Sequence, residues 1–554
     1  MPSPKNWGAP YAELECRWRN LQPLRTTNVV SEKTGNQHSE PRTLFDLRGS
    51  EGVNESERLL VTLCRKSFLR LWAQANNFTD EGFHNGRGAT KELCDALVVF
   101  GNDVLIMSDK HVEFQRDRPL DVAWPRWYRR AVAESVRQLF GARNWLRRFP
   151  HRAYLDVACT RPLPVPIPTD TEIRFHLIAV TRGCRDAAIA ARGGDGLGSL
   201  ALNTGVHGDQ HLETPFTFGQ PDPAKGFVHA FDEVTVELLM SELDTAPDFI
   251  GYLKERERVL GHPGTTLTAA GEEDLLALYL QTMDEKGERH CLPVPDGETP
   301  PDLVVVDDTL FRNLQTNPAY QRKKEADRIS YEWDRMIDRF IECGDPAIHE
   351  AFVVQPPNET EQGLRLLAAE DRFRRRQLAD AFIGAMKSVG PGDRIGRVVY
   401  GGVADESVFV FVVVPKRDAE SYEEYRKYRV ALLHAYCRIA KLQAPLGTVF
   451  VGVGFDNPHK NYPGGSEDLF VYTQKVWTAE DLAELERKRD ELQILGPNMQ
   501  IGRMRGSEFP NGESLTADAV TGMRWSHNEA ERRRRKKKKS KQKARQASQR
   551  RNRQ

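Results

Sequence analysis

Two residue groups between positions 91 and 114 have the types and spacing for metal-assisted chemistry on a phosphate ester. Asp95 stands in ELCDALVVFG, and Ser108-Asp109-Lys110 follows the apolar run VLIM. Carboxylate oxygens are preferred ligands of Mg²⁺, and such a cation activates water and stabilises charge on phosphoryl oxygens. A lysine beside it can position the water or offset the developing negative charge. We therefore expect Asp95 and Lys110 to form a catalytic pair for phosphodiester hydrolysis.

The elements that position these residues follow from turn chemistry and apolar spacing. The runs 93–100 and 104–107 are rich in β-forming residues and flank Gly101-Asn102-Asp103, which is typical of a hairpin turn. The spacing of apolar residues predicts, in chain order, a helix over 54–76, a candidate strand at 87–90, the hairpin, a helix over 127–148 and strands at 172–180 and 199–202.

With these elements around them, the motifs resemble the PD-(D/E)xK nuclease-like superfamily, which has the restriction-endonuclease-like fold. That family runs α-β-β-β-α-β, with an acid on the second strand and a (D/E)xK motif on the third. The resemblance covers about 54–205 and implies that Asp95 is the first acid, Lys110 the lysine and Glu57 the extra acid on the first helix. It implies an endonuclease of genome defence or repair that uses Mg²⁺ or Mn²⁺, with Asp95, Glu57 and Asp109 as candidate metal ligands.

The chain departs from the family pattern at Ser108, where an acid is expected two residues before the lysine. On a regular strand, residues 108 and 110 share a face and Asp109 points the other way. Either a β-bulge turns Asp109 into the site, or Glu57 or Glu92 supplies the missing ligand, or the site is inactive. Glu92 is three residues from Asp95, so it has to lie at a bent edge of the strand to reach the same face.

The charges of the chain are unevenly distributed. Its net charge is zero, but 14 Lys and Arg residues and no acid follow position 531, and the rest of the chain has a net charge of −14. The densest block is Arg532, Arg533, Arg534, Arg535, Lys536, Lys537, Lys538 and Lys539. Such a tail predicts salt-dependent binding to phosphates without sequence choice, and we expect nucleic acid, DNA in the first place, as the partner. A tail that increases solubility, or that seeks ribosome or membrane surfaces, is the alternative.

The whole chain reads as a multidomain α/β protein. The expected parts are a flexible arm (1–52), a nuclease-like α/β domain (53–256), a mainly helical region (257–390), a C-terminal α/β domain (391–496) and a disordered region with the basic tail (497–554). In the C-terminal domain the expected order is β-β-α-β-β-α, with VFVFVVV as a central strand. The arginines of EDRFRRRQLADA are expected on a solvated helix face.

Composition excludes several classes of protein. The longest apolar run, Val408–Val414, is too short for a bilayer, which takes about 20 helical residues. The first residues carry no apolar signal segment. The eight cysteines form no C-x-x-C pair, so zinc ribbons are unsupported and a reducing, cytoplasmic location is expected. Three function classes stay open: a metal-dependent nuclease, an inactive nuclease-fold protein that binds nucleic acid or acts as a scaffold, and an acidic interaction protein with a docking tail. The sequence leaves the oligomeric state open.

Overall fold

The chain folds as a mixed α/β protein with three sheets, each of which contains parallel and antiparallel pairs. The computed structural model describes residues 45, 47, 50–82, 89–169, 172–193, 196–262, 264–293, 302–343, 357–400, 406–459, 464–496, 508–510 and 523–526. Most of the predicted arm and the whole Arg/Lys block from Arg532 to Lys539 lie outside these residues. No described helix has both the length and the apolarity to cross a membrane.

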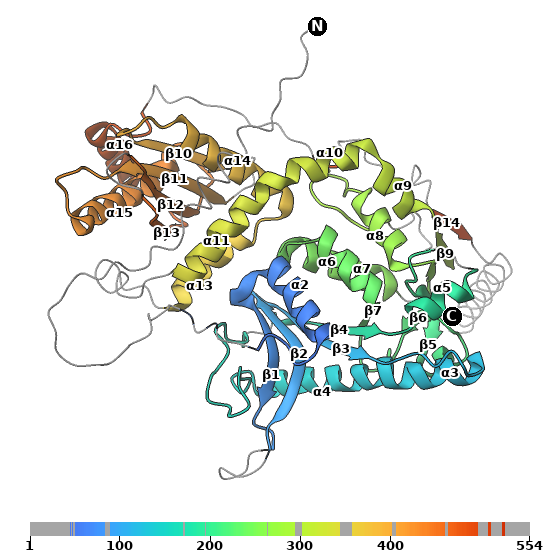
Figure 1. Cartoon of the computed structure of the whole chain (residues 1–554). Coiled ribbons are helices and arrows are strands. Elements are labelled where there is room, and N and C mark those ends of the chain that lie inside the picture. The colour runs from blue at the N-terminus through green and yellow to red at the C-terminus, as the bar shows by residue number, and fades with distance from the viewer. Residues whose placement is uncertain are drawn as a thin grey trace, which may run out of the picture. The chain divides into compact units, whose positions relative to one another are not determined.

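The described residues belong to two compact units (Figure 1). The larger unit takes its described residues from 45–344, 355–380 and 502–554, and the smaller unit from 381–501. Helix α14 (Arg372–Ser388) contributes to both units. The larger unit therefore contains both the predicted nuclease-like stretch and most of the predicted helical stretch.

The first sheet of the larger unit contains the predicted hairpin and has the order β1-β2-β3-β4-β7. Its strands are β1 (Ala73–Thr79), β2 (Lys91–Phe100), β3 (Asp103–His111), β4 (Arg174–Arg182) and β7 (His229–Asp232). β1, β2 and β3 pair antiparallel, whereas β3, β4 and β7 pair parallel. The helices around the sheet are α2 (Glu55–Trp72), α3 (Leu120–Tyr128), α4 (Glu134–Arg148), α6 (Glu233–Glu242) and α7 (Ala246–Leu260) (Figure 1).

Helices α2 and α4 cover opposite faces of this sheet. Met107 of β3 contacts Cys64 of α2, with 3.5 Å between the two sulfur atoms. The next residue, Ser108, contacts Ser135 of α4. Successive side chains of a strand point to opposite faces, so the α2 face carries the odd-numbered residues of β3 and the α4 face carries the even-numbered ones.

Strand β1 was not predicted, because helical spacing continued to residue 76. The helix ends at Trp72, and Leu69 inside its last turn has φ of +61°, outside the helical region. The β1 sequence AQANNFT is poor in β-forming residues, and antiparallel pairing with β2, for example Ala75 with Ala96, makes it a strand. The candidate strand at 87–90 lies partly outside the described residues, and β2 begins only at Lys91.

A second sheet in the larger unit takes two short strands, β8 and β9, from the stretch 257–390, whose other regular elements are helices. Its order is β14-β9-β8-β5-β6. The strands are β5 (Ala201–His207), β6 (Thr217–Gln220), β8 (Thr266–Ala269), β9 (Leu303–Val306) and β14 (Met523–Ser526). β8 and β9 have four residues each, too few for a clear alternation of apolar and polar residues. The remaining helices of the unit are α5 (Arg185–Ala191), α8 (Glu272–Leu280), α9 (Leu310–Thr316), α10 (Pro318–Asp327), α11 (Tyr331–Cys343) and α13 (Pro357–Ala368).

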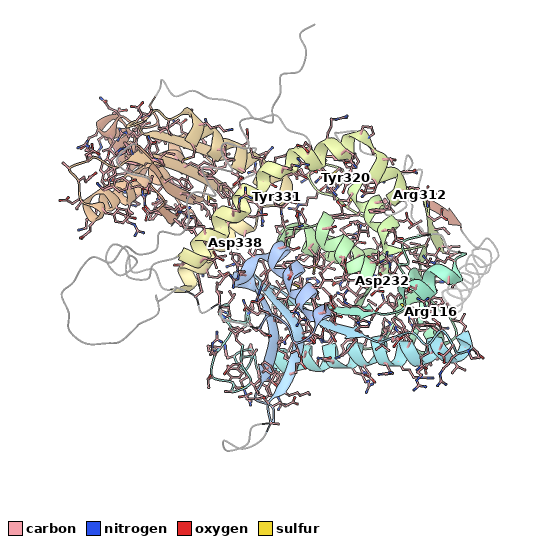
Figure 2. The ribbon with its side chains drawn as sticks, in the orientation of Figure 1. Arg116, Asp232, Arg312, Tyr320, Tyr331 and Asp338 are labelled. Atoms are coloured by element: carbon pink, nitrogen blue, oxygen red, sulfur yellow. The ribbon has the colours of Figure 1, made fainter. Side chains whose placement is uncertain are left out.

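The expectation that the arginines of EDRFRRRQLADA lie on a solvated helix face is wrong for two of them. Arg372 is buried and donates hydrogen bonds to Asp244 and Asp334 at 2.9 and 2.7 Å. Arg375 is buried and donates to Asp334 at 2.6 Å. Tyr331, labelled in Figure 2, donates its hydroxyl proton to Asp244. Asp334 lies on α11 and Asp244 in the segment between α6 and α7, so the periodicity of the arginine-rich helix alone gave no sign of this buried network.

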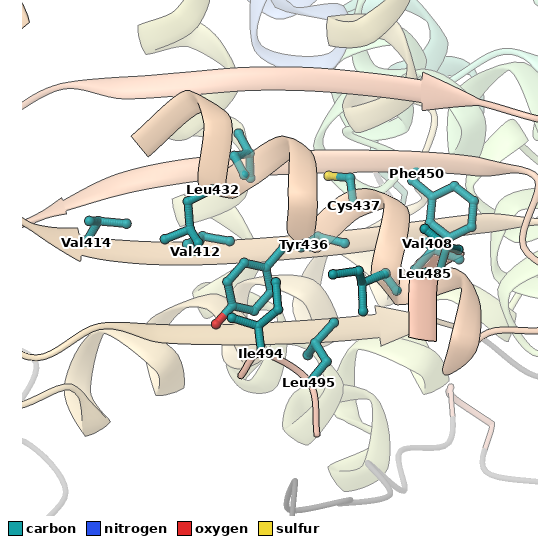
Figure 3. Packing of buried hydrophobic residues seen from close by; sticks show 14 of the residues in the cluster. Val408, Val412, Val414, Leu432, Tyr436, Cys437, Phe450, Leu485, Ile494 and Leu495 are labelled. Carbon is teal, nitrogen blue, oxygen red and sulfur yellow. The ribbon is translucent and has the colours of Figure 1, made fainter. Parts of the chain in front are cut away.

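The smaller unit has the predicted order β-β-α-β-β-α. It comprises β10 (Ile395–Tyr400), β11 (Ser407–Pro415), α15 (Tyr422–Ile439), β12 (Val449–Asn457), β13 (Glu467–Thr473) and α16 (Ala479–Leu492). The prediction that VFVFVVV is a central strand is confirmed, since β11 lies between β10 and β12. Val408 and Val412 of β11 belong to a core cluster with Leu432, Tyr436 and Cys437 of α15 (Figure 3).

Candidate active site

Asp95 lies at the point where β2 separates from β3. The pairing of β2 with β3 begins at Ala96 and Met107, and the preceding residues of β2 pair only with β1. The side chain of Asp95 is buried, and its Oδ2 accepts a hydrogen bond of 2.6 Å from the backbone N–H of Asp109. The fork between the two strands therefore holds a carboxylate that is anchored to β3 at the residue before Lys110.

The charges around Asp95 come from three of the predicted site residues. Burial raises the pKa of the Asp95 carboxyl to about 7, and the Asp109 N–H and the Lys110 charge act against this rise. The charges of Glu92 and Glu57 raise the pKa further. The positive charge of Lys110 thus acts on the Asp95 carboxyl.

Ser108 faces α4 and contacts polar side chains of that helix. Its Oγ lies 3.3 Å from the Oγ of Ser135 and 3.2 Å from Oε1 of Gln138. β3 keeps a continuous register with β4 from Asp103 to His111, so no bulge rotates the strand between them. Lys110 is half-buried and, by the alternation of the strand, lies on the same face as Ser108.

Asp109 is engaged by an arginine on the opposite face. The Nε of Arg182, the last residue of β4, lies 3.1 Å from each carboxylate oxygen of Asp109. Arg182 also makes an ion pair of 3.4 Å with Glu237 of α6. Burial raises the pKa of Asp109 despite the neighbouring Arg182 charge. The structure therefore pairs this predicted metal ligand with Arg182 and directs it away from the face of Lys110.

Glu57 and Glu92 lie near Asp95 in different settings. Glu57 is buried in the first turn of α2, where its carboxylate accepts hydrogen bonds from the Val53 N–H at 2.7 Å and from the Asn54 side-chain amide. Glu92 is exposed on β2. Within the described part of the chain, one group of three His, Cys, Asp or Glu side chains has ligand atoms close enough together to share an ion. Neither Glu57 nor Glu92 belongs to that group.

A divalent cation at the fork would have a small protein ligand set. Asp95 offers one carboxylate, and Mg²⁺ is often bound through one or two carboxylates together with substrate phosphates and water. Ser108 contributes a hydroxyl where a second carboxylate was expected from the family pattern. A cation at the fork would accordingly depend on a phosphate ester and water for its further oxygen ligands.

Arg182 and Ser135 are site neighbours that sequence reasoning missed. Arg182 falls two residues beyond the predicted strand 172–180, and a basic residue at a strand end is too common to indicate a role.

Comparisons of the chain with protein-family models, curated proteins and solved structures find no match. The chemistry of this fork must therefore be inferred from its own side chains.

Proposed function

We propose that the chain is a metal-dependent nuclease-like protein that hydrolyses phosphodiester bonds of nucleic acid, with Asp95 and Lys110 as its catalytic residues. The observation that carries the proposal is the anchoring of the buried Asp95 carboxylate to β3 immediately before Lys110. The order α2, β1, β2, β3, α4 and β4 also supports it, because it follows the α-β-β-β-α-β order of the resembling superfamily.

In this proposal the cation, Asp95, Lys110 and the Asp109 N–H have separate roles. Mg²⁺ or Mn²⁺ would supply a polarised water and neutralise charge on the phosphate. Asp95, once ionised, would hold the cation at the fork. Lys110 would orient the water or stabilise negative charge on the phosphoryl oxygens as the bond breaks. The Asp109 N–H would keep the Asp95 carboxylate in place through its 2.6 Å hydrogen bond.

A second candidate function is that of an inactive nuclease-fold protein that binds nucleic acid or serves as a scaffold. The specific observations in its favour are the hydroxyl of Ser108 in the place of an acid and the Arg182 ion pair that occupies Asp109. Both features reduce the carboxylates available to a cation on the face of Lys110. The same assays distinguish the two functions.

The first test is a cleavage assay on plasmid DNA and RNA with Mg²⁺ or Mn²⁺. We expect Lys110→Ala to reduce the rate by about 100-fold or more, because the variant loses the charge that stabilises the reacting phosphate. Lys91→Ala is the matched control, since Lys91 is exposed at the start of β2 and pairs with Glu81. Equal rates for Lys110→Ala and the wild type would remove Lys110 from the mechanism.

The second test concerns the basic tail and the partner. Deletion of residues 532–554 is expected to weaken DNA binding and to make its salt dependence shallower. If the eight-residue Arg/Lys block contacts phosphates, the slope of log K against log salt falls by up to about 7. A tail with the same residues in scrambled order should bind like the wild type, because the interaction depends on charge. An unchanged slope after deletion would exclude the tail as the phosphate-binding segment.

A further inference from the structure

A second cluster of ionisable side chains lies at the other end of the first sheet. His176 is near the start of β4, His229 begins β7, and Glu257 extends from α7. Asp103, the first residue of β3, belongs to the same cluster. Asp103 and Lys110 are seven steps apart along β3, or about 23 Å at the usual rise of a strand. The cluster is therefore distinct from the proposed nuclease site.

Three ligand atoms converge in this cluster. Oε1 of Glu257 lies 2.9 Å from Nδ1 of His176 and 2.9 Å from Nε2 of His229. All three atoms lie within 4.8 Å of one another. The two imidazoles are buried, with 1% and 0% of their side chains exposed, whereas the Glu257 side chain is 34% exposed. Two nitrogen donors and one oxygen donor thus meet beneath a partly open surface.

The outer contacts of His176 suit a metal ligand. Its Nε2 lies 2.9 Å from Oδ1 of Asp103, and the other carboxylate oxygen of Asp103 accepts a 2.8 Å hydrogen bond from Lys254. Histidines that bind metals commonly donate their second ring N–H to a carboxylate, which fixes the tautomer and orients the ring. An ion on Nδ1 requires the imidazole proton to be on Nε2, where Asp103 accepts it.

His229 has a different neighbour, Arg256, and this contact lowers the affinity of the cluster for a metal ion. Nη1 of Arg256 lies 3.3 Å from Nδ1 of His229, while Nε and Nη2 of Arg256 donate to Glu272 at 2.7 and 3.0 Å. An ion on Nε2 requires the imidazole proton to be on Nδ1, so the Nη1 group must turn away from the ring. Glu272 continues to hold Arg256, and ion binding replaces this 3.3 Å contact together with the two 2.9 Å contacts between Glu257 and the imidazoles.

We propose that His176, His229 and Glu257 form a transition-metal site that takes Zn²⁺, with its fourth position open on the exposed side of Glu257. Two imidazoles and one carboxylate are a donor set that Zn²⁺ accepts, and three protein ligands leave one position for water or an anion. The ion would join β4, β7 and α7. The proposed Mg²⁺ site at Asp95, which has oxygen ligands, would be independent of this zinc site.

The test uses the full chain, stripped with EDTA and then dialysed against Zn²⁺. We expect one zinc ion per chain by elemental analysis, and its loss in Glu257→Gln. Glu255→Gln is the matched control, because Glu255 lies on the same helix and holds Arg258. Asp103→Asn should weaken binding by about 10- to 100-fold, the usual effect of removing an outer partner of a ligating histidine.

Two further measurements test the zinc site without relying on the folding of Glu257→Gln. X-ray absorption of the zinc-loaded wild type reports two imidazole nitrogens if the proposal holds, and it requires no variant to fold. Asp95→Asn should retain its zinc. Absence of zinc from the wild type, or unchanged binding in Glu257→Gln, would overturn the proposal. Loss of zinc from Asp95→Asn together with its retention in Glu257→Gln would place the ion at the fork instead and would equally overturn it.

Discussion

Asp95→Asn is expected to reduce metal-dependent cleavage by at least about 100-fold and, at the same time, to stabilise the fold above neutral pH. The loss of activity follows because an amide cannot replace a carboxylate that holds a cation, and even outer partners of metal ligands contribute about 10- to 100-fold. The gain in stability follows because the same carboxylate is buried at the fork of β2 and β3. Cleavage rate and free energy of unfolding are the two measurements.

The sign of the stability effect follows from the two pKa values of Asp95. An unfolded aspartate has a pKa near 3.9, and burial raises the pKa of Asp95 in the fold to about 7. Wild-type stability therefore declines as the pH rises from about 4 to about 7, because ionisation is harder in the folded state. The asparagine variant keeps a carbonyl oxygen for the Asp109 N–H and carries no charge.

We expect Asp95→Asn to raise the free energy of unfolding by about 1–4 kcal/mol near pH 8, and to leave it almost unchanged near pH 4. Urea denaturation in EDTA measures this without contribution from a bound cation. Glu81→Gln, which removes an exposed acid paired with Lys91, should stay within about 0.5 kcal/mol of the wild type at both pH values. A variant that is less stable near pH 8, or that cleaves like the wild type, would contradict the role given to Asp95.

Ser108→Asp is expected to lower the Mg²⁺ concentration needed for cleavage by about tenfold or more. Ser108 follows Met107, the residue of β3 that pairs with Ala96 next to Asp95, and by the alternation of the strand it shares a face with Lys110. An acid at this position would complete the (D/E)xK pattern and give the cation a second carboxylate. Cleavage rate as a function of Mg²⁺ concentration is the measurement.

The new side chain has to be accommodated against α4. Ser108 is fully buried and contacts Ser135 and Gln138, so we expect a loss of about 1–3 kcal/mol in stability without metal. Ser108→Asn, of nearly the same size, is the control that separates this cost from the effect of charge. If the wild type is inactive and Ser108→Asp cleaves, the natural chain is an inactive nuclease-fold protein. If Ser108→Asp and Ser108→Asn bind Mg²⁺ equally, the fork is not a cation site.

The sequence by itself was sufficient for the elements with strong local signals. The β-rich runs around Gly101-Asn102-Asp103 predicted the hairpin of β2 and β3, and the structure confirms it. The apolar run of β11 predicted a central strand, and its position between β10 and β12 confirms it. Local spacing also put Asp95 and Lys110 on neighbouring strands, because a short turn allows only adjacent pairing.

Only the tertiary structure decided which side chains meet across elements distant in the chain. β1 is a strand because β2 pairs with it, despite its Ala- and Asn-rich sequence. Arg182 reaches Asp109 through the parallel register of β3 and β4, and the cluster of His176, His229 and Glu257 combines two strands and a helix. Periodicity reports which face a residue takes within its own element, whereas the register between separate elements is set by packing of the whole sheet.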